Sequence, residues 1–178
     1  MNIGGSISGA VFNDENRRFR YALWRIWDKS KEALLFIGLN PSTANDIKND
    51  PTIMKLVGFS KSWGFGGLYA GNLFSIVSAN PDVLFFESSV EQPNGLNDQA
   101  IKQMNKLCST VLVGWGEWGQ NAGLRPSQVL SLIGERAFCL KVNKSGEPSH
   151  PLYLPSSSKM TLYARNVRGN EVESDIQL

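Results

Sequence analysis

The sequence predicts an α/β protein, a three-layer α/β/α sandwich around a mostly parallel four-stranded central sheet. Two observations lead to this prediction. Four short apolar runs have the length and composition of buried strands, and segments with helical spacing separate them. The runs cover residues 33–37, 68–77, 110–114 and 137–142. Alternating strands and helices are typical of a mostly parallel sheet with helices on both faces.

A chain of 178 residues suits one domain with a substantial core and is short for two. We therefore expect a single domain over residues 1–178. It would consist of an N-terminal hairpin or extension (1–30), an α/β core (31–155) and a C-terminal tail (156–178). The tail is polar with some alternation, so we expect it to hold an edge strand or a short helix.

Bulk properties exclude several classes of protein. Hydrophobic residues make up 42% and charged residues 19%, which excludes a disordered chain. No apolar run is as long as a membrane span and the N-terminus has no signal-like pattern, so we expect a cytoplasmic protein without a membrane partner. The net charge of +2 neither requires nor excludes nucleic acid. Two cysteines and one histidine give no metal-ligand spacing, so no metal and no cofactor are expected.

Residues 1–30 are predicted to form an antiparallel hairpin, because a polar turn signal at 13–16 separates two segments. Apolar side chains alternate in the second segment, which favours a strand, although several of them also fit one face of a helix. Two arginines in this segment, Arg20 and Arg25, allow two interpretations. They either form a polar edge near a functional site or are solvated side chains on an amphipathic strand.

Helix signals follow each of the first three predicted strands. Asp50 before Pro51 supplies a capping carboxylate and then a proline at the first helical position. Asn97 is expected to cap a second helix through about Leu107, and Pro126 opens a third. Apolar residues recur at helical spacing in all three, so each helix is expected to pack one face inward.

The carboxyl ends of parallel strands meet at one edge of a sheet, where open α/β proteins place their ligands. We expect the loops at 38–44, 75–79, 114–119 and 146–155 to share this edge. The first of these loops contains Gly, Pro, Ser and Thr directly after a buried strand. It is either a ligand-binding loop or a connecting loop with a helix cap.

Three polar side chains near this edge are candidates for chemistry. Asn72 is an amide in an apolar strand, and a buried amide must bond either a neighbouring loop or a ligand. His150, the only histidine, can donate a hydrogen bond to developing negative charge or act as an acid or base, unless it is a surface residue. Asn40 can orient a water molecule or hold a ligand, but a neutral amide does not take up a proton.

Six short motifs are spread over nearly the whole chain. They are Arg20-Tyr21, Leu39-Asn40-Pro41-Ser42-Thr43-Ala44, Asp50-Pro51-Thr52, Asn72-Leu73-Phe74, Gly114-Trp115-Gly116 and His150-Pro151-Leu152. Together they resemble a bacterial and phage family catalogued as domain of unknown function 1643. This resemblance names a family without supplying an activity.

The order of the strand-end motifs is Gly-x-Asn-Pro, Asn, Trp-Gly and His-Pro, which is more distantly similar to the uracil-DNA glycosylase superfamily. The resemblance implies that superfamily's fold and an N-glycosidase acting on a base in nucleic acid or a nucleotide. Asn40 would then position the attacking water, Asn72 would read the base edge, and His150 would stabilise the departing base anion. The implied substrate-binding set also contains Gly38, Leu39, Pro41, Ser42, Trp115 and Leu152. Trp115, Phe59 and Trp63 are the candidates for the base-stacking wall, and Leu152 or Leu154 would be the wedge.

Two positions depart from the superfamily's pattern. Ser42 follows Pro41 where glycine or tyrosine is usual, and Leu152 replaces the serine that grips DNA phosphate. These departures leave two alternatives to an enzyme. One is a non-catalytic module that binds a nucleotide or nucleic acid in the same pocket. The other is a protein-interaction domain of a phage or mobile element, with exposed aromatics at Phe85-Phe86 and at the pair Trp115 and Trp118.

Overall fold

The computed structural model of the chain describes residues 1, 3–13, 15–86, 94–134 and 137–164. Its strands form a seven-stranded mixed sheet in the order β1-β2-β4-β3-β5-β6-β7. The strands are β1 (Ser8–Phe12), β2 (Arg20–Ile26), β3 (Ala33–Gly38), β4 (Gly67–Asn72), β5 (Cys108–Val113), β6 (Ala137–Cys139) and β7 (Thr161–Leu162).

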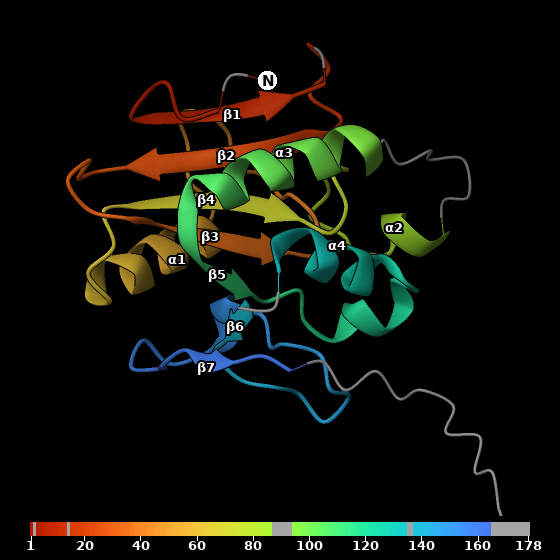
Figure 1. Ribbon diagram of the computed structural model, residues 1–178. Coiled ribbons are helices and arrows are strands. Elements are labelled where there is room, and N and C mark those ends of the chain that lie inside the picture. The colour runs from red at the N-terminus through yellow and green to blue at the C-terminus, as the bar shows by residue number, and fades with distance from the viewer. Residues whose placement is uncertain (2, 14, 87–93, 135–136, 165–178) are drawn as a thin grey trace, which may run out of the picture.

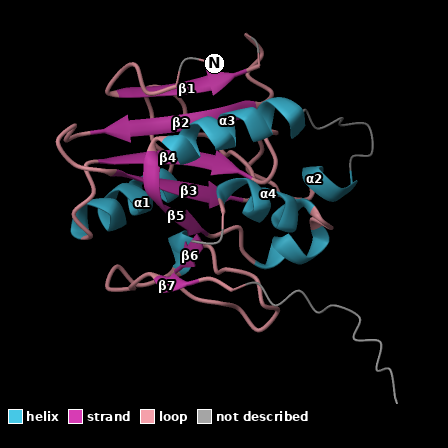
Figure 2. Cartoon of the chain, viewed as in Figure 1, coloured by secondary structure: helices cyan, strands magenta, loops and turns pink. Residues whose placement is uncertain are grey.

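Helices cover both faces of this sheet (Figures 1 and 2). On one face lies α1 (Pro51–Ser62), and on the other lie α3 (Asn94–Lys106) and α4 (Arg125–Ile133). The short helix α2 (Val83–Phe86) and the 3₁₀ turns η1 (Glu117–Asn121) and η2 (Pro151–Tyr153) lie in connections. None of the helices within the described ranges is long and apolar enough to cross a bilayer.

The four strands predicted from apolar runs lie at the centre of the sheet and are parallel, in the order β4-β3-β5-β6. The predicted hairpin β1-β2 is also present, and β2 pairs antiparallel with β4. At the other edge β7 pairs antiparallel with β6, so the tail holds an edge strand. The prediction of a mostly parallel sheet therefore holds for the centre, whereas the whole sheet is mixed because antiparallel strands extend both edges.

Two predicted boundaries are wrong around the second strand and its helix, whereas the helix ends at Lys106, one residue from the predicted end. β4 ends at Asn72 rather than at residue 77, so Asn72 closes the strand instead of lying within it. α3 begins at Asn94, which places Asn97 inside the helix rather than at its cap. The Asn97 amide donates to the carbonyl oxygens of Asn72 (2.9 Å) and Leu73 (3.2 Å), which satisfies the backbone where the ladder stops. Leu107 follows the helix and is 49% exposed.

Strand β3 shows how the core divides into two layers. Leu34 and Phe36 pack with residues of α1, whereas Leu35 and Ile37 pack with residues of α3 and α4. All four side chains are at most 3% exposed, which explains why this strand has no polar alternation. Gly38 ends the strand on the Phe36 side, because side chains alternate between faces. The loop that follows therefore opens toward α1.

Candidate functional site

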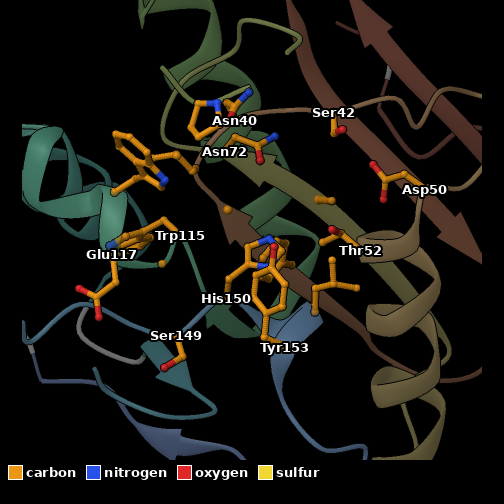
Figure 3. A pocket seen from close by; sticks show the side chains of 18 of the residues that line it. Asn40, Ser42, Asp50, Thr52, Asn72, Trp115, Glu117, Ser149, His150 and Tyr153 are labelled. Carbon is orange, nitrogen blue, oxygen red and sulfur yellow. The ribbon is translucent and has the colours of Figure 1, made fainter. Parts of the chain in front are cut away.

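A cavity of about 700 Å³ lies at the carboxyl ends of the parallel strands, next to the start of α1 (Figure 3). Loops after β3, β4, β5 and β6 all contribute to its wall. The chain changes its direction across the sheet between β3 and β5. After β3 it continues to β4 on one side of β3, and β5 then pairs with the other side of β3. Doubly wound sheets bind ligands at such a switch point, in pockets of about 300–1,000 Å³.

This cavity brings together most of the residues predicted from the sequence. Its wall includes Gly38, Leu39, Asn40, Ser42, Asn72, Trp115, His150 and Leu152. Pro41 is not among the described residues that line it. The carbonyl oxygen of Pro41 instead accepts hydrogen bonds from Asn40 Nδ2 (3.1 Å) and from the backbone N–H of Ser78 (2.9 Å). Pro41 therefore shapes the loop rather than the surface of the cavity.

Asn72 presents its amide to the cavity from the end of β4 (Figure 3). The residue is 6% exposed, and its side chain forms no hydrogen bond within the described residues. Buried amides in proteins are normally bonded, so this one is unusual. Gly38 leaves the room that the amide needs, because a Cβ there would lie 2.9 Å from Asn72 Oδ1. Both the donor and the acceptor of Asn72 are thus available to a ligand.

His150 lies directly before η2, with its ring centroid 5.7 Å from that of Tyr153. Burial lowers the pKa of His150 below its ordinary value, while the charge of Asp50 acts in the opposite direction. Nδ1 is buried and has no hydrogen-bond partner among the described residues. A buried lone pair is tolerated better than a buried N–H, which favours the neutral ring with its proton on Nε2. Nε2–H is then the group available to a ligand.

Asn40 has a structural bond pattern as well as a place in the cavity wall. Its Nδ2 donates to the carbonyl oxygens of Ser78 (2.9 Å), Pro41 (3.1 Å) and Ile76 (3.4 Å). These bonds join the loop after β3 to the loop after β4. Its Oδ1 has no partner within the described residues, so it can accept a hydrogen bond from a water molecule or a ligand.

Two buried charged residues, Arg20 and Asp50, line the cavity. The sequence left the role of Arg20 open and gave Asp50 no role in a site. Arg20 is 3% exposed and lines the cavity, so the alternative of a solvated arginine is wrong. Arg25 instead holds a loop, since its Nε donates to Asn49 Oδ1 at 2.8 Å. Asp50, predicted only as a helix cap, is 6% exposed and lines the same cavity. Asp50 both caps α1 and lines the cavity because α1 starts at the edge of the cavity. No local sequence signal reveals this placement.

A sequence-family profile described as "Protein of unknown function (DUF1643)" matches residues 20–152, more than half of the chain. The chain belongs to the DUF1643 family. The matched region starts at Arg20 and ends at Leu152, so it contains every described cavity residue except Tyr153 and Leu154. Neither the curated proteins nor the solved structures gave a match to the chain.

The aromatic residues of this DUF1643 chain differ from the expected exposed pairs. Trp115 is 1% exposed, and its Nε1 donates to the buried carboxylate of Glu147. The prediction of an exposed Trp115 is therefore wrong, and this ring is a fixed wall. Trp118, which also lines the cavity, is 36% exposed and stacks on Phe85 at a centroid distance of 5.6 Å. The side chain of Phe86 lies outside the described residues.

Tyr153 is an aromatic residue of the site that the sequence did not predict. It is 82% exposed and lines the cavity beside the half-buried Leu152, the candidate wedge. A tyrosine directly after the motif His150-Pro151-Leu152 is the sequence signal that could have indicated it.

Within the described residues, no group of three His, Cys, Asp or Glu side chains could hold a metal ion. The chemistry that this wall offers is hydrogen bonding and charge.

Proposed function

We propose that this DUF1643 protein is an N-glycosidase that acts on the base of a nucleotide or nucleic acid. The observation that carries the proposal is that Asn40, Asn72 and His150, from three separate segments, line one cavity, where the Asn72 amide forms no hydrogen bond with any described residue. The order of the strand-end motifs and the helices on both faces of the sheet support a fold related to uracil-DNA glycosylases. A cavity of about 700 Å³ has room for a nucleotide.

Base recognition is assigned to Asn72. Its amide carries an N–H donor beside a carbonyl acceptor, and the edge of a pyrimidine such as uracil carries the complementary pair. Discrimination by such a group is strong, since a base lacking the matching edge leaves the buried amide unpaired. Phe36, which also lines the cavity, offers an aromatic face or edge to the base.

His150 is assigned to the departing base. Breaking the bond between sugar and base places negative charge on the base and positive charge on the sugar. The neutral imidazole can donate Nε2–H to the base oxygen on which charge develops. A preorganised donor of this kind is worth about 3–4 kcal/mol of barrier. Asn40 Oδ1 would orient the attacking water, whose oxygen bonds the sugar carbon as the bond to the base breaks. The amide does not take up the proton of this water, which passes to the departing base anion.

A second function is favoured by one observation. The Asn40 amide nitrogen bonds three backbone carbonyls, so Asn40 already has a structural role, and an amide is not a base. A cavity with Asn72 and His150 but without an activated water would bind a nucleotide without cleaving it. This non-catalytic module is the alternative to the N-glycosidase.

The test is an assay for released base. The protein is incubated with deoxynucleotides and with single- and double-stranded oligonucleotides that contain uracil, hypoxanthine or other altered bases. Free base is then measured by mass spectrometry. We expect release by the native protein, loss in His150→Ala and Asn40→Ala, and no change in Asn105→Ala, whose side chain bonds Ile133 on the α3–α4 side. Binding without release supports the second function, and neither binding nor release contradicts both.

A further inference from the structure

Arg20 is a buried cation in the wall of the cavity. It lies at the start of β2, is 3% exposed and lines the cavity. Its Nη1 donates to the carbonyl oxygen of Ala44 at 2.6 Å, whereas Nε is buried and has no partner in the part of the chain that the structure describes. Among the described residues it forms no ion pair with a carboxylate. Buried charges in proteins are normally paired, so an unpaired guanidinium in a cavity wall points to an anionic ligand.

Two hydroxyl side chains line the same cavity, close in sequence to Ala44 and Asp50, which lie next to Arg20. Ser42 and Thr52 line it, and their hydroxyls form no hydrogen bond within the described residues. Thr52 also lies in the first turn of α1, a helix of 12 residues, where backbone N–H groups have no intrahelical acceptor. The positive end of a helix dipole favours an anion there. Figure 3 shows Ser42 and Thr52 on the side of the cavity opposite Trp115.

Asp50 contributes the opposing charge in this region. Its Oδ1 accepts from the backbone N–H of Ile53 at 2.8 Å, and its Oδ2 accepts from that of Ala44 at 3.3 Å. The carboxylate is therefore directed at the backbone and acts on Arg20 only through space. Burial lowers the pKa of Arg20 to about 10, and Asp50 limits that decrease. Asp50 therefore favours the charged guanidinium, although it forms no ion pair with it within the described residues.

We propose that the cavity contains a phosphoryl-binding subsite formed by Arg20, Ser42 and Thr52, so that its substrate is a nucleotide and not a free base or nucleoside. This inference rests on the proposed function for the base end of the ligand. Asn72 and His150 contact the base, and the sugar spans the distance to the subsite at the start of α1. A phosphoryl group accepts several hydrogen bonds at once, and a guanidinium and two hydroxyls in the wall of one cavity offer donors for them.

The test compares each nucleoside with its own 5′-monophosphate. Dissociation constants are measured by calorimetry for deoxyuridine, deoxyinosine and the four common deoxynucleosides, with and without the phosphate. We expect at least one monophosphate to bind about tenfold or more tightly than its nucleoside. Arg20→Gln, which keeps a donor for the Ala44 carbonyl, should remove this difference and leave the nucleoside constant nearly unchanged. Arg20→Lys should restore part of it.

Asp50→Asn should change the preference for the monophosphate in the direction opposite to Arg20→Gln. Asparagine caps helices as well as aspartate does, so the fold is retained while the negative charge is lost. The preference for the monophosphate should then increase. This variant tests the subsite even if Arg20→Gln fails to fold. A trinucleotide of the best base shows whether the phosphoryl group belongs to a free nucleotide or to a polynucleotide, because both carry the same oxygens.

Equal affinity for nucleoside and monophosphate, binding of neither, or an unchanged preference in Arg20→Gln would overturn the subsite. The failure of the proposed function gives a different result. A phosphate preference without base release leaves the subsite in place and removes the N-glycosidase. Base release without a phosphate preference supports the N-glycosidase and removes the subsite.

Discussion

Two buried asparagines near the end of β4 have opposite bond patterns. Asn97 is fully buried, and its amide bonds two carbonyl oxygens where the strand stops. Asn72 is nearly as buried, but its amide forms no bond within the described residues. Replacing each asparagine by alanine therefore distinguishes a side chain that stabilises the fold from one that binds a ligand.

We predict that Asn72→Ala abolishes nucleobase binding but changes the free energy of unfolding by less than about 1 kcal/mol, because no side-chain hydrogen bond to a described residue is lost. Asn97→Ala should lower that free energy by about 1–3 kcal/mol, since it removes the side-chain donor of the buried Asn72 carbonyl. The Leu73 carbonyl keeps its bond from Arg125 Nε at 2.7 Å. Urea unfolding and calorimetric binding measure the two effects. A strongly destabilised Asn72→Ala would show that the amide is structural.

Gly38 tests the same amide from the side of the loop. A Cβ at Gly38 would lie 2.9 Å from Asn72 Oδ1 and 3.0 Å from Phe36, so Gly38→Ala should displace both groups from the cavity wall. We expect nucleobase affinity to fall about tenfold or more. Gly58→Ala in α1 is the control, because a Cβ added there would have no neighbour within 4 Å, and it should stabilise the helix by about 0.5–1 kcal/mol. Equal affinity in both variants would contradict the assigned role of Asn72.

The lowered pKa of His150 predicts that the stability of the folded protein depends on pH. Its pKa in the folded protein is below the ordinary value of 6.5 because of burial, so the unfolded chain takes up the proton first as the pH falls. Its contribution to stability is complete above pH 6.5 and is lost as the pH falls from there to the folded pKa. The chain has one histidine, so a single imidazole signal in an NMR titration gives the folded pKa directly.

The replacement His150→Gln should remove this part of the pH dependence from urea unfolding between about pH 5 and 7. A folded pKa at or above 6.5 would contradict the neutral imidazole on which the proposed mechanism depends.

At the scale of elements, the start of α1 joins fold and site. Asp50 caps the helix, fixes the Ala44 loop and lines the cavity. We predict that Asp50→Ala lowers the free energy of unfolding by about 0.5–2 kcal/mol through loss of the cap, whereas Asp50→Asn keeps most of it. Chemical denaturation of both variants measures this. Equal losses would mean that charge, and not the capping bond, supports α1.

The sequence predicts the elements better than their ends. Asp50-Pro51 indicates the start of α1 because the capping bond and the fixed φ of proline act locally. The end of β4 cannot be predicted in this way. It depends on Asn97, 25 residues later, whose amide replaces the ladder bonds at Asn72. A distant side chain leaves no local signal.

At the scale of the whole molecule, the alternation of strands and helices predicts the shared edge where Asn40, Asn72 and His150 meet. The burial of Arg20 could not be predicted. It depends on β2 pairing antiparallel with β4, which brings the start of β2 beside the end of β4. Strand pairing over such a distance is set by tertiary packing, and so the charged end of the cavity emerges only from the structure.

The central claim is that Asn72 and His150 together bind a nucleobase. The most direct measurement follows the Asn72 side-chain amide and the His150 imidazole by ¹⁵N NMR during titration with the deoxynucleosides and their monophosphates. We predict that both signals shift together and saturate with one dissociation constant, and that Asn72→Ala removes the shift at His150. If neither signal moves with any of these compounds, or if the shifts map to another part of the protein, the claim is contradicted.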